Sequence, residues 1–256
     1  MQHLIQRIRI SILYSLTLTS IFLIGSVSAE SIGGIIEQNG VASLVRSGGE
    51  EITVSGTKIP GIELKDTAVT GNGRMLIEFL DEEELSIIEH TRIYIDEAYY
   101  DPDPSKSKMA IRMVQGTARF TSGRGKRINK SNVQLSTPTA EIAILGTDFT
   151  TTIDEIGQSL IILLPDEKTG LSSGKIIISN AGGTVTLEEA YQASIISSYD
   201  RAPSSPVVLS GIDTNMISNI FIVSEPKEIK EVKQQEGIMA EKDSGNILDV
   251  DFLEFN

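Results

Sequence analysis

The segment from Val133 to Ile153 constrains the fold more than any other part of this chain. It reads V-Q-L-S-T-P-T-A-E-I-A-I-L-G-T-D-F-T-T-T-I, so strand-like residues flank two interruptions, Pro138 and Gly146. Proline lacks a backbone N–H and suits a turn or a strand start, whereas glycine adopts backbone conformations closed to other residues. The three consecutive threonines favour a pleated, half-buried surface. The segment therefore predicts strands joined by corners rather than a helix.

The rest of the chain repeats this pattern of short apolar segments. Turn residues separate them roughly every 8 to 12 residues, a spacing typical of an all-β sandwich, barrel or solenoid. No long segment with helical periodicity interrupts the pattern, and there is no fixed-length repeat. We therefore expect an all-β fold of short antiparallel hairpins and stacked strands, solenoid-like or sandwich-like, with a short polar helix or a disordered tail at the C terminus.

Several segments give local predictions. Asn39-Gly40 divides the apolar run from Gly34 to Arg46 and predicts a tight hairpin turn. After Arg74 the sequence has a period of two residues, which places Met75, Ile77 and Phe79 on one face of a predicted strand.

Three further segments extend this plan. The acidic cluster Asp81 to Glu84 is expected to be the solvated turn of a second hairpin. Gln115-Gly116 is predicted to turn the chain into a strand over Thr117 to Thr121, and Ile217 to Val223 is predicted to be a last strand.

The N-terminal 29 residues have the features of a secretory signal. Arg7 and Arg9 precede an apolar run, and Val27-Ser28-Ala29 fits the small-residue rule for cleavage after Ala29. An uncleaved anchor is the alternative, although the run is shorter than the roughly 20 residues that a span needs. The domain plan is a signal peptide over 1–29, a β domain over 30–200, a linker with a final strand over 201–224, and an acidic tail over 225–256. After cleavage we expect no stable membrane span.

Charge and cysteine content limit the possible partners. The formal net charge is −13, the wrong sign for a surface that follows nucleic-acid phosphates, so we expect no nucleic-acid partner. The chain has no cysteine, so its stability does not come from disulfides even in the oxidising compartment to which a signal peptide would direct it. A bacterial envelope protein with an adequate core fits both observations.

Few side chains suit catalysis or metal binding. The histidines are His3, within the signal, and His90, which lies between apolar residues as an ordinary strand-edge histidine would. No phosphate-binding glycine loop is present, because Gly123-Arg124-Gly125-Lys126 is too short and no helix is predicted after it. We therefore expect no catalytic, cofactor-binding or metal-binding residues and no cofactor.

Carboxylates leave one enzymatic alternative open. A β-scaffold could cleave a polysaccharide with one carboxylic acid and one carboxylate, and the candidates are Asp81 to Glu84, Asp148 and Asp154. The usual sugar-stacking aromatics are scarce, because the chain has no tryptophan and only 5% aromatic residues. The composition favours binding over hydrolysis or elimination.

Two charged segments have both a functional and a structural interpretation. Gly123 to Lys130 is the one dense basic segment after the signal, and it could contact an acidic partner or a lipid phosphate. The interpretation that we favour is a solvated loop whose cations offset nearby carboxylates. Asn246 to Asn256 mixes acids with aromatics and could dock on a partner, form an edge strand or be disordered.

The sequences V-Q-G-T-A-R-F-T-S-G at 114–123 and S-T-P-T-A-E-I-A-I-L-G-T-D-F-T-T-T-I at 136–153 make the chain similar to FecR-domain proteins. The resemblance extends over about Gly33 to Leu187 and is most specific in Ser136 to Phe149. The matching residues are Gly116, Arg119, Thr137, Pro138, Ala140, Gly146, Thr147 and Phe149. Two positions depart from the family pattern. Leu145 replaces an arginine, so we expect it to be buried or to meet an apolar partner, and Glu83 replaces a glycine, which should widen or reshape its turn.

The resemblance implies an all-β periplasmic domain that works by protein contact. Well-known members of the family relay a signal from an outer-membrane transporter to a cytoplasmic sigma factor through a membrane helix that follows an N-terminal anti-sigma segment. Met1 to Arg9 are too few residues to bind a sigma factor. We therefore expect a free-standing, exported FecR-like module in the periplasm or outer envelope, which binds another envelope protein or a surface polymer.

Overall fold

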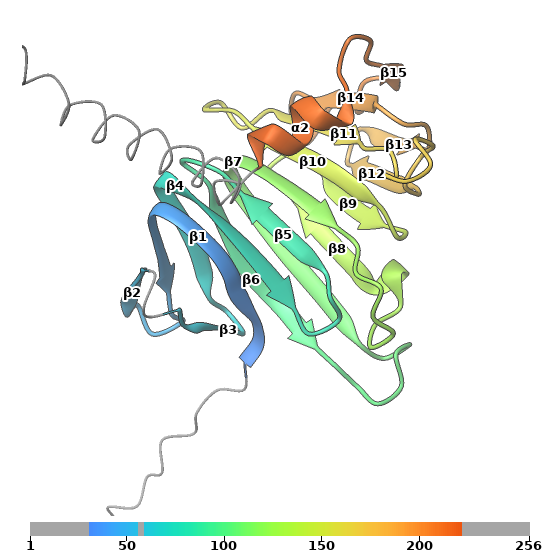
Figure 1. Cartoon of the computed structure of the whole chain (residues 1–256). Helices are drawn as coiled ribbons and strands as arrows, with labels where there is room; N and C mark the ends of the chain where they lie inside the picture. Colours follow the sequence, from blue (N-terminus) through green and yellow to red (C-terminus); the bar gives the residue numbers. More distant parts are fainter. Residues whose placement is uncertain (1–30, 56–58, 222–256) are drawn as a thin grey trace, which may run out of the picture. The chain divides into compact units, whose positions relative to one another are not determined.

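The computed structural model describes residues 31–55 and 59–221. Within these ranges the strands form one 15-stranded sheet, which confirms the all-β prediction (Figure 1). All pairings are antiparallel except the pairing of β7 with β8. The predicted signal segment, and the polar helix or disordered tail predicted at the C terminus, lie outside the described residues.

The strands are short apart from β1, β4 and β7. Their bounds in chain order are β1 (Ser31–Val45), β2 (Glu51–Val54), β3 (Gly61–Glu63), β4 (Thr67–Phe79), β5 (Glu84–Ile87), β6 (Arg92–Tyr99), β7 (Lys108–Thr121), β8 (Val133–Ser136), β9 (Glu141–Ile144), β10 (Asp148–Ile153), β11 (Ser159–Leu163), β12 (Ile176–Asn180), β13 (Gly183–Leu187), β14 (Gln192–Ile196) and β15 (Val207–Val208). A 3-10 turn, η2 (Lys130–Asn132), precedes β8, and one helix, α2 (Thr214–Ile220), follows β15.

Strand β7 lies at the centre of the sheet and pairs along both edges. Its first half pairs with β6 and β8, and its second half pairs with β5 and β10. Strands β5 and β6 therefore follow one another in the space between β4 and β7. Beyond β10, the sheet continues through β11 and β14 to β15.

The two halves of β7 meet at Gly116, which has a positive φ of 93°. A Cβ at this position would collide with the side chain and backbone of Thr91, in the link between β5 and β6. The Thr91 hydroxyl accepts the Thr117 N–H at 3.0 Å and closes this junction. The predicted turn at Gln115-Gly116 is therefore wrong, because the glycine marks a change of pairing partners within one strand.

Strand β1 also runs through its predicted turn. Gly40 has a positive φ of 72°, but the chain continues along β4 with a shift in register between Gly40 and Ala42. The predicted hairpin at Asn39-Gly40 is therefore wrong, since the same backbone conformation serves an irregularity in a long strand. Gly61–Glu63 pairs with the start of β1 as β3.

The segment from Val133 to Ile153 forms strands joined by corners, as predicted. Pro138 lies in the corner between β8 and β9, where the Thr137 hydroxyl accepts the Ala140 N–H at 3.1 Å. Gly146, with a positive φ of 76°, lies in the corner between β9 and β10.

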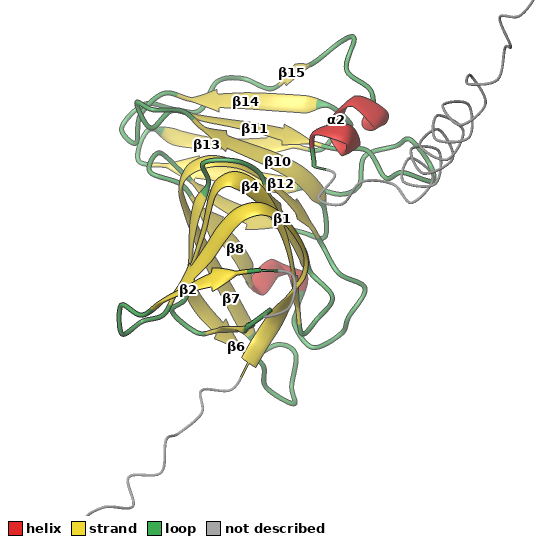
Figure 2. Cartoon of the chain, turned by 60° about the vertical axis from the view of Figure 1, so that its left-hand side comes forward, coloured by secondary structure: helices red, strands yellow, loops and turns green. Residues whose placement is uncertain are grey.

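The main core lies on one face of the strongly curved sheet (Figure 2). Met75, Ile77 and Phe79 of β4 are buried in it, which confirms the predicted alternation. Phe120 of β7 and Phe149 of β10 pack with ring centroids 5.7 Å apart. Alternating side chains on β4, β5, β7 and β10 therefore face away from this core.

A smaller apolar cluster lies beneath α2. Ile217 and Phe221 pack with Ile162, Leu164 and Ala193. Asp213 accepts the Met216 N–H at 2.8 Å, as an N-terminal cap does. The predicted strand over Ile217 to Val223 is therefore wrong within the described residues, because a cap and two apolar residues four apart favour a helix. No helix in the described part of the chain is long and apolar enough to cross a membrane.

Candidate functional site

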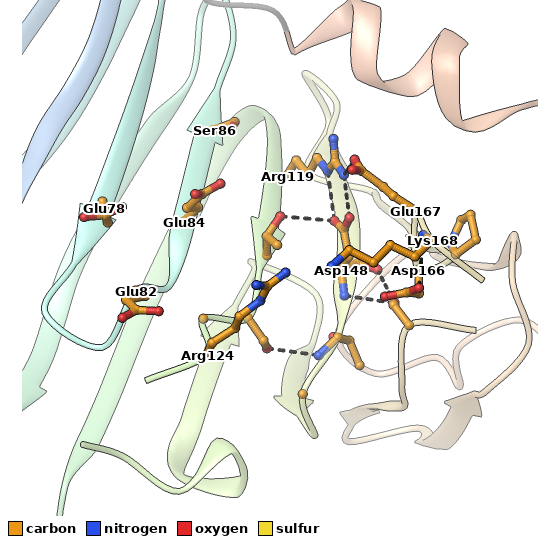
Figure 3. Close-up of a pocket in the computed structure, with 17 residues that line it drawn as sticks. Glu78, Glu82, Glu84, Ser86, Arg119, Arg124, Asp148, Asp166, Glu167 and Lys168 are labelled. Atoms are coloured by element: carbon orange, nitrogen blue, oxygen red, sulfur yellow. Dashed lines mark hydrogen bonds and ion pairs between the residues drawn. The ribbon is translucent and has the colours of Figure 1, made fainter. Parts of the chain in front are cut away.

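An open groove of about 610 Å³ lies across β4, β5, β7 and β10 on the face of the sheet opposite the main core (Figure 3). The loop after β11 and the basic segment after β7 border it. It is lined by Glu78, Glu82, Glu84, Ser86, Arg119, Thr121, Ser122, Gly123, Arg124, Gly146, Thr147, Asp148, Pro165, Asp166, Glu167, Lys168 and Ser173. Most of the lining residues are thus charged or carry a hydroxyl group.

Strand register places four of these side chains in one row. Glu78 pairs with Glu84, Glu84 pairs with Thr121, and Thr121 pairs with Asp148. Side chains at directly paired positions lie about 4.5–5.5 Å apart at Cβ. Two carboxylates therefore face each other at one end of the row, and a third lies at the other end.

Arg119 holds the carboxylate of Asp148. Its Nε donates to Oδ1 at 2.9 Å and its Nη2 to Oδ2 at 2.5 Å, a bidentate pair, and Nη2 also donates to Glu167 at 3.2 Å. The hydrogen bonds to Asp148 raise the pKa of Arg119 even though burial opposes the charge. Because both oxygens of Asp148 are occupied, this carboxylate is part of the wall of the groove and not a free base.

The backbone of Asp148 is fixed as firmly as its side chain. Its N–H donates to the Ser173 hydroxyl at 3.0 Å, and its carbonyl oxygen accepts the Leu164 N–H at 2.8 Å. The loop between Leu164 and Ser173 is thereby attached to β10. This attachment brings Asp166, Glu167 and Lys168 to the border of the groove.

A second charged cluster is buried beside the groove. Asp81 and Glu83 are 0% exposed, and Lys130 donates to their carboxylates at 3.0 and 2.7 Å. Burial raises the pKa of Glu83 to about 7, against the attraction of Lys130. Burial disfavours the ammonium charge, but the hydrogen bonds to the two carboxylates raise the pKa of Lys130.

The prediction that Asp81 to Glu84 form a solvated turn is therefore wrong for two of its residues. Of the four residues only Glu82 is exposed, and it has the positive φ of 63° that this tight turn requires. Glu83 directs its carboxylate to Lys130. Glu83, which stands where the FecR pattern has a glycine, thus forms an ion pair with Lys130.

The basic segment from Gly123 to Lys130 packs on this turn. A Cβ on Gly123 would collide with the backbone of Asp81 and Glu82, and one on Gly125 with Asp81. The Arg127 N–H donates to Asp81 Oδ1 at 2.5 Å. This arrangement favours the interpretation in which Lys130 offsets buried carboxylates, while Arg124, Lys126 and Arg127 remain exposed.

The other candidate residues lie apart from the groove. His90 is exposed, with a positive φ of 57°, in the link between β5 and β6. Asp154 follows β10 and accepts the N–H groups of Ile156 and Gln158 in the next turn. Asp148 and Asp154 lie at opposite ends of β10, roughly 20 Å apart for an extended strand. Among the described residues no group of three or more histidines and carboxylates could hold a metal ion.

Leu145 lies at the corner before β10 and is 39% exposed. The expectation that it is buried is therefore wrong, and the alternative of an apolar partner stays a prediction. Its backbone N–H donates to Lys175 O at 3.1 Å. We expect Leu145→Arg to change the free energy of unfolding by no more than about 0.5 kcal/mol. Urea unfolding measures this change. Ile144→Arg, at a fully buried position, is the control that must unfold the domain, and a loss above about 1.5 kcal/mol for Leu145→Arg would contradict the expectation.

The sequence did not reveal the acidic row or the role of Lys130. Glu78 and Glu84 lie in two segments whose alternating apolar residues can be seen in the sequence. Pairing these segments as a hairpin about the acidic turn could have placed the two glutamates opposite each other. Lys130 is separated from Asp81 by 49 residues, and no local pattern relates them.

Comparisons with known proteins gave a family match and a structural match. The family model for FecR protein matches residues 65–164. A crystal structure at 2.50 Å of a proposed anti-sigma factor from Parabacteroides distasonis ATCC 8503 aligns with a TM-score of 0.39 and 14% identity. That alignment covers 53% of this chain and 56% of the other, so it spans about half of each. No curated protein matches the chain. The family match extends from the turn before β4 to the end of β11 and includes most of the residues that line the groove. The chain thus contains a FecR domain over residues 65–164.

Proposed function

We propose that the chain is a non-catalytic FecR-like binding and signalling module, exported to the periplasm or outer envelope, which contacts another envelope protein through the groove. The observation that carries the proposal is the Arg119–Asp148 pair. It lies inside the FecR-matched region and fixes the carboxylate of Asp148 in the wall of the groove. A surface polymer is the other ligand class that the test must distinguish.

The enzymatic alternative has less support. A polysaccharide-cleaving pair needs carboxyl groups about 5–9.5 Å apart, whereas Asp148 and Asp154 lie at opposite ends of a strand. Asp148 is also held by Arg119 through both oxygens. Both features suit a fixed recognition surface better than a carboxylate that must accept a proton.

Site-specific photo-crosslinking in the native cell tests the proposal. A photoreactive residue at Ser86, in the groove, should form a covalent adduct with an envelope protein, whereas one at the exposed Glu51 of β2 should not. Fractionation of the same cells should place the adduct in the envelope. An adduct of polysaccharide alone, or equal adducts at both positions, would contradict it. Loss of a polysaccharide-cleaving activity in a folded Asp148→Asn, Asp154→Asn variant would establish the enzyme instead.

A further inference from the structure

We propose that the basic segment from Gly123 to Lys130 opens and closes on the turn at Asp81 to Glu83, and that protonation of Glu83 favours the closed state. This inference goes beyond the proposed function, because it holds whichever ligand the groove binds. It stands on the two carboxylates at which the contacts of the segment converge, and on two buried oxygen atoms without hydrogen-bond partners.

The polar contacts of the basic segment converge on two carboxylates. The Arg127 N–H donates to Asp81 Oδ1 at 2.5 Å, and Lys130 Nζ donates to Asp81 and Glu83 at 3.0 and 2.7 Å. In the described part of the chain, these are the side chains that accept hydrogen bonds from the segment. The charge on the two carboxylates therefore governs how firmly the segment is held.

The opening that we propose is local. A Cβ on Gly123 or Gly125 would collide with the turn, so the backbone of the segment lies directly on it. Gly123 and Arg124 also line the groove. Opening withdraws these residues from the turn and Ile128 from the main core, whereas β7 and β8 on either side keep their pairings. The position of the segment thus shapes one border of the groove.

The closed state buries an excess negative charge when both carboxylates are ionised. Asp81 and Glu83 are 0% exposed, and Lys130 is the one cation that donates to them from within the described ranges. Glu83 Oε2 is buried and has no hydrogen-bond partner there. Burying a charged oxygen without a donor is costly. A proton on Glu83 Oε2 removes the excess charge and leaves Asp81 paired with Lys130.

Tyr100 supplies a second, independent observation. Its hydroxyl group is buried and likewise lacks a hydrogen-bond partner among the residues that the structure describes. Burial, followed by the charges of Glu83 and Asp81, raises the pKa of Tyr100, so the hydroxyl lies close to the two carboxylates. A protonated carboxyl group is a donor, and a hydroxyl oxygen can accept its hydrogen bond. Protonation of Glu83 thus supplies a donor where two oxygen atoms are otherwise unpaired.

The groups around Glu83 set the direction of the pH effect. Asp81 lies on the same turn, Lys130 begins η2, Tyr100 follows β6, and Arg127 acts on Tyr100. Burial raises the pKa of Glu83 from an ordinary 4.5 to about 7 in the closed state. Closing is therefore strongest below about pH 4.5 and weakens as the pH rises through about 7. The equilibrium constant for opening should rise about tenfold between pH 6 and pH 8.

Amide hydrogen exchange at Arg127 tests the inference. This N–H exchanges with solvent only when its hydrogen bond to Asp81 opens. In the purified wild type, the protection factor of this amide should fall about tenfold from pH 6 to pH 8, after correction for the intrinsic exchange rate. Adding about 0.5 M urea should leave the protection factor unchanged, because a local opening exposes little surface.

Three variants identify the proton and its acceptor. Glu83→Gln cannot titrate, so the protection factor of Arg127 should change less than about twofold over the same pH range. Tyr100→Phe removes the acceptor and should reduce the tenfold fall to about threefold. Tyr99→Phe, which removes an exposed hydroxyl bonded to Asp101, is the matched control and should keep the full fall.

Four results would each overturn the inference. They are a protection factor of Arg127 that is independent of pH in the wild type, a tenfold fall retained in Glu83→Gln, a fall that is unchanged or larger in Tyr100→Phe, and exchange of Arg127 only through global unfolding in urea. None of these measurements involves a partner, so their outcome does not depend on the proposed function.

Discussion

Replacing Lys130 with methionine will lower the free energy of unfolding by about 3–5 kcal/mol. The ammonium group is the ionic partner of Asp81 and Glu83, both of which are fully shielded from solvent. Methionine keeps the length of the side chain and removes the charge. Above about pH 7, Glu83 is ionised in the wild type. The variant must then either bury two carboxylates without a cation or bind a proton at Glu83, and either costs more than the loss of an exposed ion pair.

Urea unfolding followed by circular dichroism measures the effect. Lys126→Met, at an exposed position of the same loop, should change the free energy of unfolding by less than about 0.5 kcal/mol. Adding Asp81→Asn and Glu83→Gln to Lys130→Met removes the stranded charges and should restore much of the loss. A loss below about 1 kcal/mol for Lys130→Met would show that water or another group compensates these carboxylates.

The stability difference between the wild type and Glu83→Gln should depend on pH. Burial raises the pKa of Glu83 from an ordinary 4.5 to about 7 in the folded protein. The folded state therefore binds this proton more tightly than the unfolded chain does. The stabilisation from Glu83 is fully present below about pH 4.5 and is lost as the pH rises through about 7. The glutamine side chain cannot titrate, so the free energy of unfolding of Glu83→Gln does not contain this pH-dependent contribution.

Urea unfolding of both proteins at several pH values between about 5 and 8 measures the difference. The wild type should lose up to about 3 kcal/mol relative to Glu83→Gln across this range. Taking the difference between the two free energies of unfolding at each pH cancels the contributions of the other carboxylates, which both proteins share. Parallel stability curves would show that Glu83 stays ionised in the fold.

Local patterns predicted the strands and their buried faces well. Met75, Ile77 and Phe79 alternate because one face of β4 is covered, and Pro138 and Gly146 mark real corners. The errors at Asn39-Gly40 and Gly116 share one cause. A glycine with positive φ serves equally well in a turn, in an irregular long strand or at a change of pairing partners. Only the neighbouring strands distinguish these cases.

The candidate site was less predictable, because strand register creates it. Arg119 and Asp148 were visible as a motif residue and a candidate carboxylate, yet their pairing depends on how β7 and β10 align over 29 residues of sequence. The contact of Lys130 with Glu83 spans 47 residues. Single-sequence periodicity gives the face of a strand but not its partner, so rows such as Glu78, Glu84, Thr121 and Asp148 appear only in the folded chain.

The four partners of β7 have a consequence for how the chain acquires its fold. Residues from Glu84 to Ile153 must all be present before both edges of this strand are filled. Its pairings with β8 and β10 also close loops, which costs conformational entropy. No cut after β7 leaves two self-sufficient pieces, because the first would end in a strand with an open edge. The described sheet is therefore a single cooperative unit held together at its middle strand.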